Sequence, residues 1–332
     1  MSTEMTGHSP AQIDIDKKIV KNKKGFFKKV WEARWCYLFM LPALSLATLF
    51  TFYPIVCSWY YSLLQWSGFT AQKTFIGLSN YVEVINDKYF WDAFFRSFQF
   101  MLTSLPIKLT LALILAIILN DRALKLSPVF RTMFFIPVVT TAAIVGIVMS
   151  FIVSPFNGPL NTVLRTAGLV KAPVDFLGNP ATAIWTVIAI EIWKWLGQPM
   201  IYWLAALQTI PRELYEAAKV DGANWWAQVR YITIPLLVPF AIVIVLITAV
   251  GTLHVFPLVQ TMTGGGPFFA TEVMEIYIYR TAFGGESGMS AIPRLGYASA
   301  AGVFFGVTIM IIAIFQAFGV RRLRDFRNDL TR

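Results

Sequence analysis

Four long stretches of this chain contain no Asp, Glu, Lys or Arg. They cover residues 35–72, 132–164, 231–271 and 295–320. A helix needs about 20 apolar residues to cross a bilayer, so each stretch is long enough for at least one span. Hydrophobic residues make up 57% of the chain and charged residues 14%, whereas soluble domains carry roughly 25% charge. The sequence therefore predicts an integral membrane protein and nearly excludes a water-soluble enzyme.

Hydropathy in windows of about 19 residues predicts six transmembrane helices and an all-α, polytopic fold. We expect the spans at 36–58, 97–119, 132–154, 181–207, 235–257 and 297–319. The six-helix domain, residues 35–320, would lie between a basic cytoplasmic N-terminal segment, 1–34, and a basic cytoplasmic tail, 321–332. The first span is too long for the apolar region of a signal peptide, so we expect it to be a permanent helix.

Basic residues indicate the orientation. Of the 28 Lys and Arg residues, 19 fall on the side that holds both termini, which predicts that both termini are cytoplasmic in the cell membrane. The net charge of +10 gathers beside the apolar spans, which disfavours nucleic-acid binding and is typical of contact with membrane lipid. Cys36 and Cys57 share one apolar stretch, and His8 and His254 are the two histidines, so no metal site is expected.

The connection between the fourth and fifth expected spans, residues 210–235, has the pattern of a helix, a turn and a second helix. Pro211 suits a first helical turn, and Glu213 and Glu216 follow where a helix start favours anions. Asp221-Gly222 supplies a break, after which 223–231 is expected to form a second short helix before Pro235 opens the fifth span. An amphipathic connector lying on the lipid surface is the simpler alternative.

Glu216-Ala217-Ala218, Gly222 and the sequence Ile232-x-Ile234-Pro235 resemble the EAA loop of permease subunits of bacterial ABC importers. In that family the loop is a coupling helix that docks into a cleft of a cytoplasmic ATPase. The resemblance implies that coupling is carried by Glu213, Glu216, Ala217, Ala218, Asp221, Gly222 and Ala223.

Further motifs resemble the carbohydrate-uptake branch of that family, which includes the maltose and glycerol-3-phosphate type permeases. They are Phe75 to Tyr81, Leu204 to Pro211, Thr263 to Thr271, Tyr279 to Phe283 and Gly296 to Ala300. The similarity covers roughly residues 36–320 and implies the type I ABC importer permease fold. The chain lacks the large periplasmic insertion of the enteric maltose permease, and its tail lacks the ending of a second permease, so we expect the first partner of a heterodimer.

No phosphate-binding loop of the form G-x-x-x-x-G-K-[ST] is present, so ATP and Mg²⁺ are expected on a separate ATPase chain and this chain is expected to be non-catalytic. The triple glycine, 264–266, is followed by Pro267 and is better explained as a turn. The resemblance implies a second permease, two ATPase copies, an extracytoplasmic binding protein, and a sugar, oligosaccharide or polyol-type substrate.

Four ionisable residues fall within the expected spans, where such groups are expensive: Lys108, Glu191, Lys194 and His254. Glu191 and Lys194 are three residues apart, which places them on one helical face where they can pair. Lys108 and Glu191 are both predicted near mid-depth, which allows a contact between helices. A structural ion pair and a functional site both remain open.

Gly197 and Pro199 are expected to kink or open the fourth span. This segment resembles the one that contributes to a sugar site in maltose-type permeases. The implied candidates for the substrate path are Trp193, Trp195, Gly197, Gln198 and Met200, with Thr252 and His254 on the fifth span. An ordinary packed interface is the competing explanation for these residues.

Two other classes of protein fit six spans. An ion-coupled secondary transporter would use Lys108, Glu191 and His254 as a relay, and a membrane scaffold would transport nothing. Neither alternative accounts for the EAA-like loop.

Overall fold

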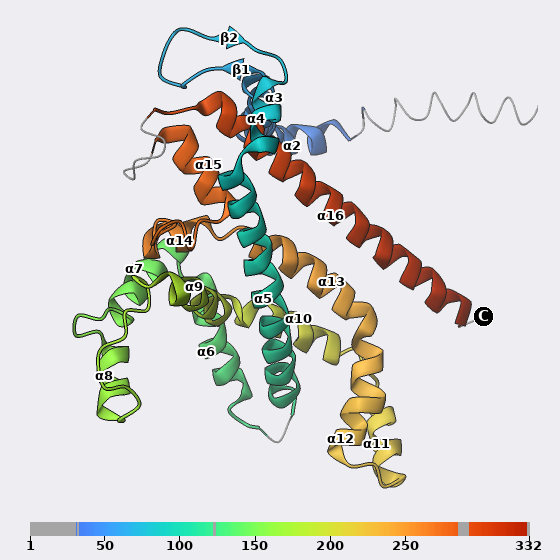
Figure 1. Ribbon diagram of the computed structural model, residues 1–332. Helices are drawn as coiled ribbons and strands as arrows, with labels where there is room; N and C mark the ends of the chain where they lie inside the picture. Colours follow the sequence, from blue (N-terminus) through green and yellow to red (C-terminus); the bar gives the residue numbers. More distant parts are fainter. Residues whose placement is uncertain (1–30, 32, 122–123, 285–291, 331–332) are drawn as a thin grey trace, which may run out of the picture. The chain divides into compact units, whose positions relative to one another are not determined.

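The computed structural model describes residues 31, 33–121, 124–284 and 292–330 (Figure 1). Most of the expected N-terminal segment, 1–34, lies outside the described residues. The chain divides into two compact units, Met1–Tyr60 and Tyr61–Arg332. In the first unit, α2 (Arg34–Ala47), the π-turn η1 (Thr48–Phe52) and α3 (Tyr53–Tyr61) form one apolar helix of 28 residues. This helix agrees with the first expected span, and none of its residues is buried.

The second unit begins with a small hairpin, which departs from the all-α expectation. Strand β1 (Leu64–Gln65) pairs antiparallel with β2 (Thr74–Phe75), and α4 (Ser79–Asn86) follows. The buried Asn80 side chain donates to the carbonyls of Ser62 (2.8 Å) and Leu64 (2.9 Å). Asn80 belongs to one of the family-like motifs, and its hydrogen bonds fix the connection between the first and second spans.

Helix α5 (Lys88–Leu119) is the second expected span and begins nine residues before residue 97, the expected start. Its first turn is capped by Asp87, whose carboxylate accepts from the Tyr89 amide (2.8 Å). At 32 residues the helix measures about 48 Å at ~1.5 Å per residue, so it exceeds the ~30 Å core of a bilayer.

The third expected span, 132–154, is not one straight helix. It consists of α6 (Ser127–Val139) and α7 (Ala142–Ile152), which meet at 100° across Thr140 and Thr141. The expectation of a continuous helix is wrong because Thr140 and Thr141 take non-helical backbone angles, which end α6 and begin α7 in a new direction. Helix α8 (Pro159–Thr166) follows in the next connection.

The fourth expected span, 181–207, is broken as Gly197 and Pro199 predicted. It consists of α9 (Pro180–Trp195) and α10 (Gly197–Leu207), which are separated at Leu196. Among the described residues, four helices are long and apolar enough to cross a membrane, or five if the bent α6–α7 pair is one span. The broken α9–α10 segment is the expected span that does not meet this criterion.

The connection at 210–235 contains α11 (Arg212–Val220), α12 (Trp225–Gln228) and the π-turn η2 (Val229–Thr233). Helix α13 (Ile234–Thr252) continues from η2 without interruption, so residues 225–252 form one helix of 28 residues. The expectation of a separate second short helix is therefore wrong. The wide π-turn accommodates the missing N–H of Pro235, so proline does not break the helix here.

The last elements are α14 (Phe256–Met262), α15 (Met274–Phe283) and α16 (Leu295–Leu330). Helix α16 includes the sixth expected span and continues through most of the expected tail. The fifth span ends at Thr252, so His254 lies beyond it rather than on it.

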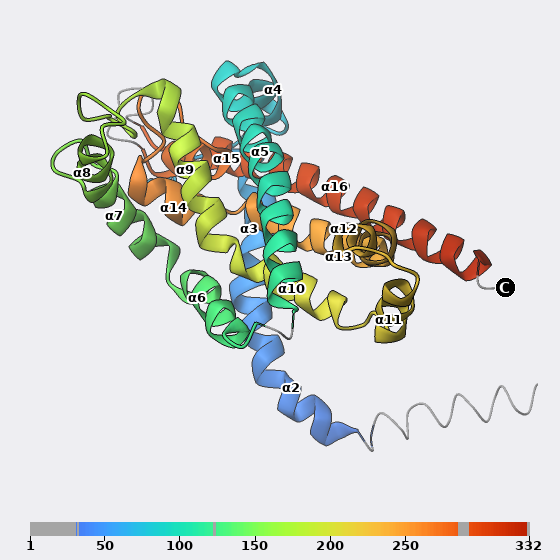
Figure 2. The ribbon, with the colours of Figure 1, turned by 90° about the horizontal axis from the view of Figure 1, so that it is seen from below.

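Helix α5 forms the centre of the second unit and packs against α9, α10, α13 and α15. Buried side chains form three core clusters. Phe90 and Tyr277 belong to one near the start of α5, and Met200 belongs to one near the end of α5. Val187 and Val259 belong to the remaining cluster. Helices α6 to α8 lie on one side of α5 and α11 to α13 on the other in both views (Figures 1 and 2). The β1–β2 hairpin and the α11–α12 connection lie at opposite ends of α5 (Figure 1).

Candidate functional site

Residues 210–235, which we call the coupling segment, present their first helix on the surface. Helix α11 has no buried residue, and Glu213, Glu216, Ala217 and Asp221 are exposed. A hydrogen bond between the Tyr215 hydroxyl and the Thr233 hydroxyl (2.9 Å) joins α11 to η2. The structure therefore brings the predicted coupling residues together on one external helix and its following turn.

Gly222 ends α11 in a conformation that other residues rarely adopt. Its φ is +79°, and its amide donates to the Lys219 carbonyl (3.1 Å). The next amide, of Ala223, donates to the Ala218 carbonyl (2.8 Å), which completes a Schellman turn. Asn224 then caps α12 by accepting from the Ala227 amide (2.8 Å). The break predicted at Asp221-Gly222 is confirmed, with glycine where φ must be positive.

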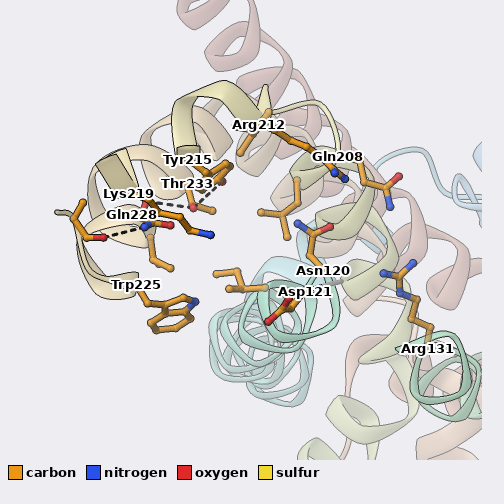
Figure 3. Close-up of a pocket in the computed structure, with 15 residues that line it drawn as sticks. Asn120, Asp121, Arg131, Gln208, Arg212, Tyr215, Lys219, Trp225, Gln228 and Thr233 are labelled. Carbon is orange, nitrogen blue, oxygen red and sulfur yellow. Dashed lines mark hydrogen bonds between the residues drawn. The ribbon is translucent and has the colours of Figure 1, made fainter. Parts of the chain in front are cut away.

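A pocket of about 850 Å³ lies behind the coupling helix (Figure 3). Its walls come from the ends of α5 and α10, from α6, and from the coupling segment itself. The lining side chains with charged or polar groups are Asn120, Asp121, Arg131, Gln208, Arg212, Tyr215, Lys219, Trp225, Gln228 and Thr233. The side-chain amide of Gln228 donates to the Ala223 carbonyl (3.0 Å). This hydrogen bond joins the turn after α11 to helix α12 in the pocket wall.

A second group of polar residues lies inside the helical unit, and we call Lys108, Glu191, Lys194 and Thr252 the interior polar cluster. The Lys108 ammonium lies 2.5 Å from Glu191 Oε1 and donates to the Thr252 hydroxyl (2.9 Å). Lys108 and Glu191 are 2% and 1% exposed, so the contact that their predicted depths allowed is present. It joins α5, α9 and α13 at one point.

Lys194 does not form the predicted pair with Glu191. Its ammonium donates to the carbonyls of Pro137 (3.2 Å), Val138 (3.4 Å) and Thr140 (2.9 Å). These carbonyls are released by the break between α6 and α7. The prediction was wrong because the helix spacing could not reveal that a neighbouring helix ends beside Lys194.

Gly197, the first residue of α10, permits close contact with α6. A Cβ at this position would lie 2.3 Å from the Phe134 carbonyl oxygen and 3.0 Å from the Phe135 Cα. Because these are backbone atoms, they cannot rotate out of the way. Gly197 is therefore placed as a packing residue, beside the break whose carbonyls Lys194 binds.

Residues 76–325 match the family described as the binding-protein-dependent transport system inner membrane component. The chain belongs to this family. It is a permease subunit of a binding-protein-dependent importer, a non-catalytic component of the inner membrane.

Relatives of this permease align along almost their entire length. The probable ABC transporter permease YurN of Bacillus subtilis (strain 168) is 37% identical, covering 88% of this chain and 95% of its own. The lactose transport system permease LacF of Rhizobium radiobacter is 34% identical, covering 86% and 93%. The trehalose/maltose transport system permease MalF of Thermococcus litoralis (strain ATCC 51850 / DSM 5473 / JCM 8560 / NS-C) is 33% identical, covering 81% and 90%.

The permease also resembles a chain in the crystal structure of a bacterial ABC transporter that imports the acidic polysaccharide alginate. The TM-score is 0.75 at 27% identity, with 90% of this chain and 98% of that chain covered. A second structure of a bacterial alginate transporter, in complex with an alginate pentasaccharide-bound periplasmic protein, gives the same TM-score at 25% identity and covers 90% and 97%.

The substrate-path candidates of the permease fall into two environments. Trp193 is 46% exposed and lines an apolar cavity of about 410 Å³ with residues of α6 and α7. Trp195 and Gln198 are half-buried, with the Lys194 ammonium 4.1 Å from the Trp195 ring centre and the Gln198 amide donating to the Tyr202 hydroxyl (2.9 Å). Met200, in contrast, is fully buried in a core cluster, which is the position of a packing residue.

His254 pairs with Glu275 rather than with a residue of the interior polar cluster. Its Nδ1 lies 2.9 Å from Glu275 Oε1, and the other oxygen of Glu275 accepts from the Phe256 amide (2.7 Å). The hydrogen bond with Glu275 raises the pKa of His254 although partial burial lowers it. Thr252 instead belongs to the interior polar cluster. The relay that a secondary transporter would need, of Lys108, Glu191 and His254, is therefore divided between two sites.

Sequence reasoning missed an ionic network that joins the α14–α15 connection to α15 and α5. Glu272 is 2% exposed, its Oε1 lies 2.7 Å from Arg280 Nη2, and its carbonyl accepts from Arg96 (3.1 Å). Burial raises the pKa of the Glu272 carboxyl to about 7, although Arg280 and Arg96 lower it. Arg96 is distant in sequence from the other two residues, so no local pattern could have indicated the network.

Proposed function

We propose that this permease pairs with a second permease to form the membrane path for a sugar, oligosaccharide or polyol derivative. Two copies of a cytoplasmic ATPase would bind the coupling segments of the two permeases and supply the energy. An extracytoplasmic binding protein would deliver the substrate to the opposite face. The observation that carries this proposal is the external helix α11, which has no buried residue in its own chain.

The form of the coupling segment supports the docking of another protein. Helix α11 projects at one end of the second unit, and the Schellman turn at Gly222 holds its exposed residues in a fixed shape (Figure 1). Glu213 and Glu216 are charged, whereas Ala217 is small and leaves room for a close neighbour. A short exposed helix of this kind is suited to insertion into a cleft.

The substrate class is supported by relatives of the permease. LacF and the Thermococcus MalF are named as lactose and trehalose/maltose permeases, and AraP of Bacillus subtilis as an arabinooligosaccharide permease. The aromatic Trp193 on a cavity wall is suited to packing against a sugar ring. We therefore propose a carbohydrate substrate.

We further propose six spans with both termini in the cytoplasm. The α9–α10 pair would be the remaining span, because 27 helical residues with one break suffice for a core of about 30 Å. The excess of Lys and Arg on the side of the termini supports the orientation. In this arrangement the coupling segment lies in the cytoplasm, where an ATPase can reach it.

In the proposed mechanism, ATP-driven closure of the ATPase pair moves the two coupling helices toward each other. The hydrogen bond between Tyr215 on α11 and Thr233 on η2 would pass this motion to the fifth span. The path would open alternately to the two faces of the membrane. The residues assigned to docking are Glu213, Glu216, Ala217, Ala218, Asp221, Gly222 and Ala223.

The test measures uptake of radiolabelled maltose, lactose and arabinooligosaccharides in cells that lack the native chain. We expect Gly222→Pro and Glu216→Lys to abolish uptake, because proline cannot adopt a φ of +79° and lysine reverses a docking charge. Both variants should still insert in the membrane. A tag on this chain should copurify a second permease and an ATPase with the wild type, and less ATPase with the variants.

Lys171→Glu is the matched control, because it reverses an exposed charge outside the coupling segment. Undiminished uptake in both coupling variants would refute the assignment of the coupling segment. Recovery of the chain alone, with uptake driven by an ion gradient, would refute the importer mechanism.

A further inference from the structure

The pocket behind the coupling helix gathers positive charge. Arg131 on α6 and Arg212 and Lys219 on α11 line it, with Asp121 as the acidic residue of the lining. None of the three basic residues forms an ion pair within the described part of the chain. The pocket therefore has the electrostatic character of a site for an anion.

Arg131 has hydrogen-bonding capacity that the protein leaves unused. Its Nη2 donates to the Leu119 carbonyl (2.7 Å), but its Nε is buried and has no partner. A guanidinium is well matched to the oxygens of a phosphate, and Arg131 lines the pocket. Figure 3 shows Arg131 on one side of the hollow and Lys219 on the opposite side, with Arg212 on α11 above.

The remaining walls suit an amphiphile better than a bare ion. The volume of about 850 Å³ falls within the range of ligand pockets, roughly 300–1,000 Å³. Asn120 and Gln208 offer amides, whereas Ile117, Leu207 and Val229 provide apolar surface. Trp225, also in the wall, is of the residue type that gathers at membrane–water interfaces.

We infer that this pocket binds the phosphate head group of an anionic phospholipid from the cytoplasmic leaflet. Basic pockets between membrane helices on the cytoplasmic side bind such head groups in other proteins. The inference rests on the orientation in the proposed function, which places the coupling segment in the cytoplasm. A head group that fills the pocket contacts Arg131 on α6 and Lys219 on α11, so the bound lipid restrains the coupling helix.

The test uses the transporter purified through a tag on this chain and reconstituted in nanodiscs of phosphatidylcholine with or without phosphatidylglycerol. Native mass spectrometry then counts the phosphatidylglycerol that remains bound after release from the nanodisc. Wild type should retain phosphatidylglycerol, and Arg131→Gln and Lys219→Gln should each weaken retention about fivefold. Arg230→Gln, an exposed basic residue of the same segment outside the pocket lining, should leave retention unchanged.

Equal retention in wild type and in the Arg131→Gln/Lys219→Gln double variant would overturn the inference. Displacement of the lipid by water-soluble glycerol 3-phosphate at equal concentration would also overturn it, because the site would then select the soluble compound. The same spectra report the subunits, so loss of the ATPase from wild type identifies a failure of the proposed function instead. Subunit masses unchanged in the variants show that they fold and assemble.

Discussion

The coupling segment and the interior polar cluster contain charged residues in opposite settings. In the coupling segment, Glu213 and Glu216 are exposed and form no ion pair in the described part of the chain. In the interior polar cluster, Lys108 and Glu191 are buried and paired. Exposed charges are available to bind another protein, whereas buried charges already bind partners in their own fold. Substitutions in the first region should therefore affect assembly and transport, and those in the second should affect stability first.

The largest effect on stability is expected for Lys108→Met. This change leaves the Glu191 carboxylate buried without its partner and should lower the free energy of unfolding by about 3–5 kcal/mol. Thermal unfolding of the purified subunit in mild detergent would measure the loss.

The double variant Lys108→Met/Glu191→Leu tests whether the loss reflects the unpaired charge. Replacement of a buried ion pair by apolar residues is often neutral, so the double variant should recover most of the stability. A double variant as unstable as Lys108→Met alone would contradict the pairing explanation.

Gly197→Ala is expected to have an intermediate effect. The new methyl group would collide with the backbone of α6 at Phe134, which should cost about 1–3 kcal/mol of unfolding free energy. Gly306→Ala is the matched control, since a Cβ there would meet nothing within 4 Å and alanine favours a helix. Denaturation midpoints that fall equally in both variants would show that close packing at Gly197 is not the cause.

The smallest effect is expected for His254, whose pair with Glu275 is partly exposed. In exposure, this pair is intermediate between the coupling segment and the interior polar cluster. Its raised pKa means that protonated His254 stabilises the fold fully below pH 6.5, its ordinary value, and that this contribution is lost as the pH rises through the raised pKa. Because solvent screens the pair, the contribution should be below about 1 kcal/mol. A difference between the melting temperatures of wild type and His254→Gln that does not shrink with rising pH would contradict the assignment.

The sequence predicted the parts of this permease that depend on local pattern. Charge-free stretches located the apolar helices, and Asp221-Gly222 located the turn after α11, because glycine is favoured where φ is positive. The kink before Gly197 was predicted for the same kind of reason. These features depend on residues close together in the chain.

Apart from the contact between Lys108 and Glu191, which their predicted depths allowed, features set by contacts between distant segments were not predicted. Lys194 binds carbonyls at the end of α6 and at Thr140, more than fifty residues away, rather than Glu191 on its own helix. His254 pairs with Glu275, and Met200 packs in the core instead of facing a path. The helix from Trp225 to Thr252 was divided in the prediction because a proline pattern alone does not reveal a π-turn.

That continuous helix has a mechanical consequence. It begins three residues after Gly222 and ends at Thr252, whose hydroxyl accepts from Lys108. Its 28 residues span about 42 Å at ~1.5 Å per residue, with the turn at Gly222 near one end and the buried ion pair at the other, so in the proposed mechanism it would act as a lever arm. A tilt of a few degrees at the turn would displace the far end by more than a hydrogen bond can stretch. In the proposed mechanism, the hydrogen bond between Lys108 and Thr252 would break when the helix tilts and re-form when it returns.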